Sequence, residues 1–125
     1  MVSLPERVRQ AWADRDGPAI LATVSPEGIP NIVYVASVSI FGEDRFVIAD
    51  NYFDKTRRNI EATGRGALLF LTKERKSYQV KGVFEYYTSG PIFNQMKAVN
   101  PPKHPGHAAV ALRVEEIYSG AEKIG

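Results

Sequence analysis

The sequence predicts a mainly β domain, a closed or nearly closed antiparallel barrel of about six strands with three short peripheral helices. Two observations predict this class. Short apolar runs rich in β-branched residues recur between turns that contain glycine or proline. Helical periodicity is limited to three short segments and does not alternate with every strand, as it would in a doubly wound parallel sheet.

Length and composition bound the organisation and the chemistry. The 125 residues match one ordinary domain, so residues 1–125 are expected to form a single unit. The chain has no cysteine, which excludes disulfides, thiolate metal sites and cysteine nucleophiles. The segment 1–7 lacks a secretory pattern, and no apolar run is long enough to span a bilayer. We therefore expect a soluble, cytoplasmic protein with no membrane partner.

Charge gives no sign of a nucleic-acid partner. Sixteen basic and fourteen acidic residues leave a net charge of +2, and both signs are spread along the chain. The densest basic cluster, residues 73–76, contains Glu74 and lies between two strand-like runs. A solvated hairpin loop accounts for it.

The first expected element is an N-terminal helix. Residues 3–6, Ser-Leu-Pro-Glu, combine a hydroxyl, a proline and a carboxylate in a capping-box pattern. Leu4, Val8 and Trp12 follow at helical spacing until a Gly-Pro break at 17–18. We expect Trp12 to pack into the core rather than to stack on a ligand.

Strand patterns occupy most of the remaining chain. Gly82 interrupts the interior of the fifth run and indicates a bulge or a barrel bend. The apolar phase of the last run slips between Val114 and Ile117, which indicates a second bend there. A third helix is expected over residues 91–99, with Met96 in the core. The expected strands cover residues 19–24, 31–41, 45–49, 67–72, 78–88 and 108–114, the last continuing toward Tyr118.

A second helix, over residues 55–62, has few apolar residues and invites a functional explanation. Asp54 is its expected N-cap and Gly64 its left-handed stop. A helix with so little to bury gains little from packing. Its start offers the Lys55 ammonium, the Thr56 hydroxyl and unpaired backbone N–H groups, which together suit a phosphate.

Two interpretations of this helix start remain open. In one, Lys55 and Thr56 bind an anion, with Arg57 or Arg58 as a second cation. In the other, it is an ordinary capped helix whose arginines are solvated, because a Lys-Thr pair is a weak motif by itself.

Other motifs predict no metal site and no catalytic side chain. His104 and His107 are the only histidines, and they lie among prolines and a glycine, which disfavours a shared metal. No triad or nucleotide-binding loop is found. Glu115 and Glu116 are neighbours in a strand, so their side chains are expected to point to opposite faces.

Five segments occur together in an order and spacing that resemble the pyridoxamine 5'-phosphate oxidase-like split-barrel flavoproteins. The most specific is Lys-Thr-x-x-Asn-Ile, placed a few residues after a strand ending in Ala-Asp-Asn. The resemblance covers about residues 3–119. Its segments are residues 28–33, 47–51, 55–60, 78–82 and 110–118.

The resemblance implies a six-stranded antiparallel split β-barrel that binds FMN without covalent attachment. Family members are typically homodimers with two flavins at the subunit interface, and the aromatic pairs at 52–53 and 86–87 are candidates for burial there. Lys55 and Thr56 match the residues that hold the flavin phosphate. The implied cofactor-binding residues are Val35, Ala36 and Ser37 along the flavin, Asp50 and Asn51 at the polar edge of its ring, and Lys55 and Thr56 at the phosphate.

Two classes of function follow. The first is an FMN-dependent oxidoreductase or electron-transfer protein reduced by a nicotinamide donor or a redox protein, in which the flavin is the only chemical actor. Vitamin B6 oxidation is not expected, because the C-terminal arginine motif of the oxidases proper is not found here. The second is a non-catalytic binding or storage module for another planar cofactor, haem or a deazaflavin. Haem would require His104 or His107 as its axial ligand.

Overall fold

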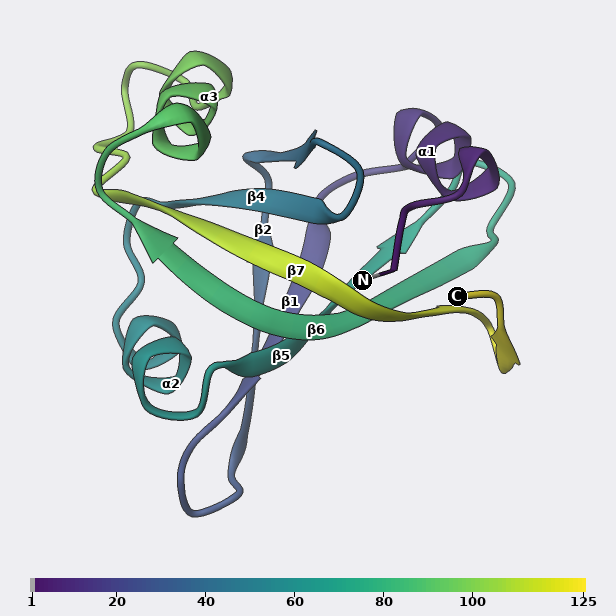
Figure 1. The fold of residues 1–125 in the computed structure, drawn as a ribbon, viewed down its shortest axis with the longest axis horizontal. Helices are drawn as coiled ribbons and strands as arrows, with labels where there is room; N and C mark the ends of the chain where they lie inside the picture. Colours follow the sequence, from purple (N-terminus) through teal and green to yellow (C-terminus); the bar gives the residue numbers. More distant parts are fainter. Residues whose placement is uncertain (1) are drawn as a thin grey trace.

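A single antiparallel sheet curls into a half-open barrel in the computed structural model, which describes residues 2–125 (Figure 1). Its strand order is β2-β1-β5-β6-β7-β4-β3, and the short β8 pairs with β7. This confirms the mainly β class with short helices at the edges. The strands are β1 (Ala19–Val24), β2 (Pro30–Val35), β3 (Val38–Phe41), β4 (Arg45–Asp50), β5 (Arg65–Leu71), β6 (Ser77–Tyr87), β7 (Ala108–Ser119) and β8 (Glu122–Lys123). The helices are α1 (Glu6–Ala13), α2 (Lys55–Thr63) and α3 (Pro91–Val99).

The strand count differs from the expected six because the run 31–41 is two strands rather than one. β2 pairs with β1 at one edge of the sheet, whereas β3 pairs with β4 at the other edge. Ala36 and Ser37 carry the chain between these edges, and the Ser37 carbonyl accepts a hydrogen bond from the Ala49 N–H at 3.1 Å. The strand β8 was not expected either. We call the crossing at Ala36 and Ser37, with the unpaired sides of β2 and β3, the seam of the barrel.

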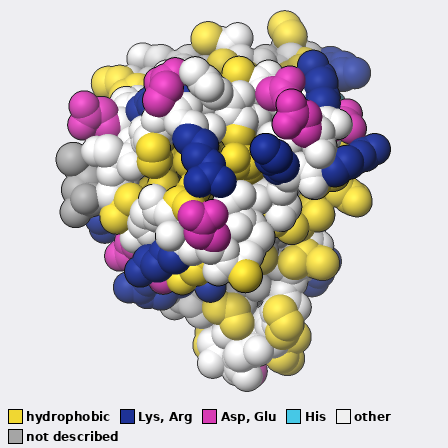
Figure 2. All heavy atoms as spheres, turned by 90° about the vertical axis from the view of Figure 1, so that its right-hand side faces the viewer, with side chains coloured by type: hydrophobic (Ala, Val, Ile, Leu, Met, Phe, Trp, Pro, Cys, Tyr) yellow, Lys and Arg dark blue, Asp and Glu magenta, His cyan; other side chains and the backbone are white. Residues whose placement is uncertain are grey.

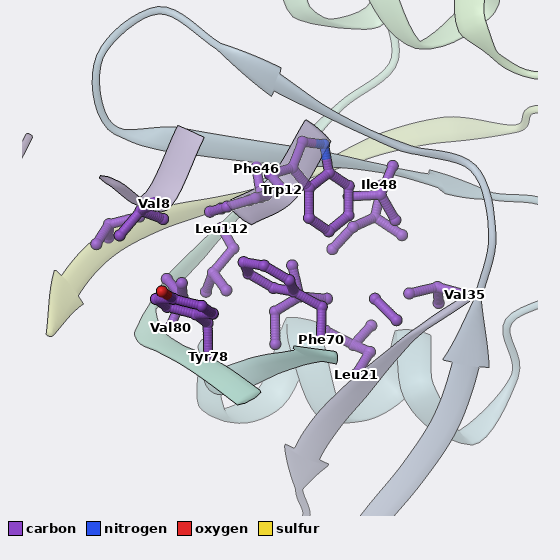
Figure 3. Close-up of a cluster of buried hydrophobic side chains, with 14 of the residues drawn as sticks. Val8, Trp12, Leu21, Val35, Phe46, Ile48, Phe70, Tyr78, Val80 and Leu112 are labelled. Carbon is purple, nitrogen blue, oxygen red and sulfur yellow. The ribbon is translucent and has the colours of Figure 1, made fainter. Parts of the chain in front are cut away.

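An aromatic cluster fills the barrel interior (Figure 3). The Trp12 ring meets the rings of Phe46 and Phe70 edge-on, with centroid distances of 5.2 and 5.0 Å. Trp12 and Val8 bring α1 onto this core, so the core position expected for Trp12 is confirmed. Such edge-to-face pairs contribute about 0.5–1.5 kcal/mol each beyond the area they bury.

A second apolar cluster lies between α3 and the opposite face of β4 and β7. Ile92 and Met96 of α3 pack against Val47 and Ala111. Met96 is almost fully buried, which confirms its expected core position. α3 is thereby held beside the loop that follows it, residues 100–107.

The first helix starts later than the capping box predicted. α1 begins at Glu6, its N-cap is Pro5, and no side chain of residues 2–125 caps it. A cap at Ser3 would require Leu4 to be helical, but a residue before proline is driven to extended backbone. The Leu4 N–H instead donates to the Glu43 carbonyl at 2.7 Å.

The bulge expected at Gly82 is present. Gly82 pairs with Val114 and Lys81 with Glu116, so Glu115 is the extra residue in β7. A Cβ atom at Gly82 would overlap the Arg113 carbonyl oxygen. Glycine therefore permits the close strand approach that bends β6 and β7 around the barrel. Within residues 2–125, no helix is both long and apolar enough to cross a membrane.

Candidate functional site

A cavity of about 500 Å³ opens at the seam of the barrel. Its wall includes residues 33–38, which run from β2 across the seam into β3. Ala49 of β4 and residues 51–53 of the β4–α2 loop form a second side. Because β2 and β3 each lack a partner strand on their seam side among the described residues, backbone groups there are available to a ligand.

Four of the seven predicted cofactor-binding residues line this seam cavity. Val35, Ala36 and Ser37 lie together on the crossing segment, and Asn51 faces them from the end of β4. The whole β3–β4 hairpin separates Ser37 from Asn51 in the chain, yet the crossing brings both residues to the same cavity. The structure thus brings these four residues together around one space.

Asp50 does not line the seam cavity and is bonded inside the protein. Only 2% of it is exposed. Its carboxylate accepts a hydrogen bond from the Phe53 N–H at 3.1 Å and another from the Tyr86 hydroxyl at 2.7 Å. Burial and the hydrogen bond to Asp50 raise the pKa of Tyr86 to about 12. Asp50 thereby fixes the loop that carries Asn51; its direct contact with a flavin stays a prediction.

Two further side-chain pairs shape the seam cavity. The amides of Asn51 and Asn100 exchange hydrogen bonds of 3.0 and 2.8 Å, and Asn51 Oδ1 also accepts the Gly106 N–H at 2.9 Å. These bonds hold the loop 100–107 against β4. The Tyr52 hydroxyl lies 3.1 Å from His104 Nδ1, and both residues line the cavity. The pair offers polar groups that can donate to or accept from a bound ring.

Lys55 lines a second cavity, of about 510 Å³, with Arg58, Asn31 and Asn59 among its other residues. The two cavities follow one another along β2, because residues 29–31 line the second and residues 33–35 the first. A strand rises about 3.3 Å per residue, so one elongated ligand can reach both.

The start of α2 is not capped as predicted. Asp54 makes no side-chain capping bond and instead pairs with Arg58 at 3.5 Å, both side chains being well exposed. An exposed pair of this kind contributes little to stability. The N–H groups of the first turn are therefore left to solvent or to an anion. The left-handed stop at Gly64 is confirmed, with a φ of 70°.

Thr56 is buried beneath this helix start. Its Oγ1 accepts a hydrogen bond from Asn31 Nδ2 at 3.0 Å, and the same amide also donates to Thr23 at 3.1 Å. A hydroxyl that accepts one hydrogen bond can still donate another. Asn59 donates to Thr23 as well, at 3.1 Å, so α2 is fixed to β1 and β2 through a polar network.

Sequence reasoning missed two residues of the site, Asn31 and Arg15. Asn31 could have been found, because it alternates with Val33 and Val35 on one strand face and is the single polar residue of that set. Arg15 had no signal, since it lies in the break after α1 and reaches the seam cavity only in the folded chain.

One sheet face is apolar and exposed. Ile32 and Tyr34 of β2 are 70% and 74% exposed, and the strand register places Tyr34, Ile20 and Leu69 in one row across β2, β1 and β5. The β1–β2 hairpin projects at the bottom of Figure 2, where hydrophobic side chains cover much of it. On the face above it, basic and acidic side chains are interspersed. Exposed apolar faces of this kind are typical of interaction surfaces.

Comparison with known families identifies one that matches nearly the whole chain. Residues 4–120 match the family described as pyridoxamine 5'-phosphate oxidase. The uncharacterized protein MJ0282 of Methanocaldococcus jannaschii is 31% identical over 105 residues, which cover 79% of this chain and 70% of that protein. HupZ of Group A Streptococcus is 25% identical, with a TM-score of 0.84 over 98% of this chain and 99% of the other. An FMN-binding protein of Syntrophomonas wolfei is 21% identical, with a TM-score of 0.82 over 94% and 86%.

Structures with other ligands in their names share the fold. An F420 reductase is 17% identical, with a TM-score of 0.71 over 92% of this chain and 98% of the other. The haem storage protein HutZ of Vibrio cholerae is 15% identical, with a TM-score of 0.68 over 94% and 95%. At such identities the likeness establishes the fold and leaves the ligand open.

Proposed function

Because the chain belongs to the pyridoxamine 5'-phosphate oxidase family, as its sequence motifs predicted, we propose that it binds FMN without covalent attachment and serves as an oxidoreductase or electron-transfer protein. The observation that carries the proposal is the succession of two cavities along β2, one with a largely apolar wall and one beside the Lys55 ammonium. FMN consists of a planar ring and a phosphate joined by a flexible chain, so its two ends can occupy these two cavities.

The residues present fit such a ligand. Val35, Ala36 and Ser37 offer backbone groups along the ring, and the Asn51 amide faces the same space. In the proposal, Lys55 and the uncapped N–H groups of α2 receive the phosphate. Thr56 is buried beneath this helix start and lines neither cavity, so its hydroxyl contact with the phosphate is part of the proposal. When bound, FMN supplies hydride or single-electron transfer, and these residues orient it and set the polarity around it.

The proposed assembly is a homodimer. The exposed row of Tyr34, Ile20 and Leu69 lies on β2, the same strand that lines both cavities, and on its neighbours β1 and β5. A two-fold contact through this face covers apolar surface on both copies at once. The proposed redox partner is a nicotinamide donor or a redox protein. A cytoplasmic location stays a prediction from the sequence.

A non-catalytic role in binding or storing haem or a deazaflavin is the second candidate. One observation favours haem: His104 lines the seam cavity, and its Nδ1 lies beside the Tyr52 hydroxyl, which leaves Nε2 for an axial bond. FMN is preferred because Lys55 and the α2 start provide the phosphate site that haem does not require. Reduction of the bound pigment by NADH or NADPH, with turnover, separates an enzyme from a storage protein.

The first experiment is an absorption spectrum of the purified protein, with identification of any pigment released by denaturation. A yellow protein that releases FMN supports the proposal, and a colourless protein that does not take up added FMN refutes it. The Lys55→Ala, Thr56→Val double variant then tests the phosphate site. Two charge-assisted hydrogen bonds contribute about 3–6 kcal/mol, so FMN affinity should fall at least a hundredfold.

Riboflavin is the matched ligand control, because it lacks the phosphate. Its affinity should be nearly equal in the double variant and in the unaltered protein. A Lys123→Ala variant, which removes an exposed lysine of β8, controls for net charge. Equal FMN affinity in a folded double variant would remove the phosphate site from α2.

A further inference from the structure

Arg15 is held differently from the other arginines of the chain. Its Nη1 donates to the Trp12 carbonyl at 2.8 Å, and its guanidinium carbon lies 3.9 Å from the centroid of the Trp12 ring. No carboxylate oxygen of residues 2–125 lies within 4.0 Å of it, whereas seven of the nine arginines have such a partner. Those seven are Arg7, Arg45, Arg57, Arg58, Arg65, Arg75 and Arg113.

Arg9 is the ninth arginine and provides a contrast. It also lacks a carboxylate partner within residues 2–125, but its guanidinium donates to the carbonyls of Leu4 and Gly42 and lines none of the cavities described here. Arg15, in contrast, lines the seam cavity. Its side chain therefore combines a charge that lacks a carboxylate partner within residues 2–125 with access to the seam cavity.

The seam cavity has no acidic residue in its wall, so Arg15 is its one permanent charge among the described residues. Burial lowers the pKa of Arg15, because the guanidinium loses part of its hydration without gaining an anionic partner. Stacking on Trp12 fixes the planar group, which reduces the entropy lost when it pairs with a ligand. A guanidinium presents five N–H donors in a fork that matches a carboxylate.

We propose that Arg15 is a binding site for the carboxylate of a planar, conjugated acid that shares the seam cavity with the flavin. Val33 and Val38 offer apolar wall to the flat body of such a molecule outside the segment 35–37 assigned to the flavin, and Arg15 receives its charged end. The FMN phosphate is assigned elsewhere, since Lys55 lines the second cavity and Arg15 does not. The proposal rests on the proposed function for the flavin, and it names the class of small molecule brought to the ring.

Trp12 makes the test independent of the flavin. It is the single tryptophan of the chain, and its ring is in contact with the Arg15 guanidinium, so its fluorescence reports a ligand that pairs with Arg15. Benzoate is the probe and benzamide its uncharged counterpart. Both are titrated into the FMN-free and FMN-loaded forms of the unaltered protein, Arg15→Gln, Arg15→Lys and the matched control Arg9→Gln.

The expected result is saturable benzoate binding to both forms of the unaltered protein. Its Kd should rise at least tenfold in Arg15→Gln, less in Arg15→Lys, and not at all in Arg9→Gln, while benzamide binds weakly throughout. FMN affinity should be unchanged in Arg15→Gln. Circular dichroism melting confirms that each variant is folded, and Arg15→Lys, which keeps the charge without the planar fork, serves as the test if Arg15→Gln does not fold.

Several outcomes overturn the inference. Equal benzoate affinity in Arg15→Gln, an equal loss in Arg9→Gln, or binding only to the FMN-free form would each do so. Loss of FMN affinity in Arg15→Gln without benzoate binding would assign Arg15 to the flavin itself. If the unaltered protein binds benzoate through Arg15 but takes up no FMN, the proposed function fails and the carboxylate site remains.

Discussion

Replacing Tyr86 by phenylalanine tests the contact that holds the loop between β4 and α2. The Tyr86 hydroxyl donates to Asp50 at 2.7 Å, and Asp50 also receives the Phe53 N–H from within that loop. The phenyl ring of the variant keeps the shape of the side chain and its position beneath the Arg57 guanidinium, which lies 5.2 Å from the ring centroid of Tyr86. The substitution therefore removes one donor and leaves the packing.

The loss of folding stability in Tyr86→Phe can be estimated in two ways. A buried charged acceptor that loses one of its donors costs about 1–3 kcal/mol. The pKa of Tyr86, about 12 against an ordinary 10.0, corresponds to about 2.7 kcal/mol in total. Burial is the largest cause of this shift, and solvent reaches the partly exposed ring, so the hydrogen bond to Asp50 accounts for only part of it, about 1–2 kcal/mol. We expect Tyr86→Phe to lower the free energy of unfolding by about 1–2 kcal/mol at neutral pH.

The effect should depend on pH in one direction. The folded state raises the pKa of Tyr86, so it favours the protonated hydroxyl. This stabilisation is complete below about pH 10, the ordinary pKa, and is lost as the pH rises through about 12. The difference between the unaltered protein and Tyr86→Phe should therefore be constant up to about pH 10 and shrink above it.

Urea unfolding followed by Trp12 fluorescence measures this difference at a series of pH values. Tyr118→Phe is the matched control, because the Tyr118 hydroxyl donates to Glu116 at 2.7 Å on the surface and its loss should cost under about 0.5 kcal/mol. A Tyr86→Phe protein as stable as the unaltered one, or a difference that persists unchanged to about pH 12, would refute the reasoning.

Three further predictions concern other parts of the fold. Gly82→Ala should lower the free energy of unfolding, measured with urea, by about 3 kcal/mol or more, because the new Cβ overlaps the Arg113 carbonyl. A loss below about 1 kcal/mol would contradict the close approach of β6 and β7. Ile32→Glu should shift the sedimentation coefficient from that of the proposed dimer to that of a monomer, since it places a charge on the exposed apolar face; a dimer in both proteins would place the interface elsewhere, and a monomeric unaltered protein would contradict the proposed assembly. Asn100→Ala should lower the free energy of unfolding by about 1–3 kcal/mol, because the Asn51 amide loses its hydrogen-bond partner. It should also speed proteolysis within residues 101–106, and unchanged cleavage would show that other contacts hold this loop.

Elements whose cause is local could be predicted from the sequence. Gly64 ends α2 in the left-handed conformation that glycine adopts without steric cost. The bulge opposite Gly82 and the slip of phase after Val114 are two views of one irregularity, in which Glu115 is the unpaired residue. Trp12 and Met96 are buried because their helices each present one apolar stripe.

Features that depend on competing or distant contacts could not be predicted. The break in the run 31–41 has no composition signal, since it results from β2 and β3 pairing with different strands. The expected cap at Ser3 does not form, because Leu4 precedes Pro5 and is therefore restricted to extended backbone. Asp54 pairs with Arg58 instead of capping, a choice between two short-range contacts that the sequence leaves open.

The candidate site lies where β2 and β3 have backbone groups without a partner strand among residues 2–125. The seam exists because β2 and β3 are consecutive in the chain yet lie at opposite edges of the sheet. Only Ala36 and Ser37 join those edges, and small residues keep the crossing tight enough for Ser37 to bond to Ala49. The family resemblance assigned residues 35–37 and the α2 start to the cofactor, but it did not predict the crossing, because the run 31–41 has the pattern of one strand. The charge in the seam cavity comes from Arg15, on a connection earlier in the chain. A ligand at the seam thus meets strand backbone, an amide and one guanidinium, and it is the guanidinium that distinguishes an acidic molecule from a neutral one.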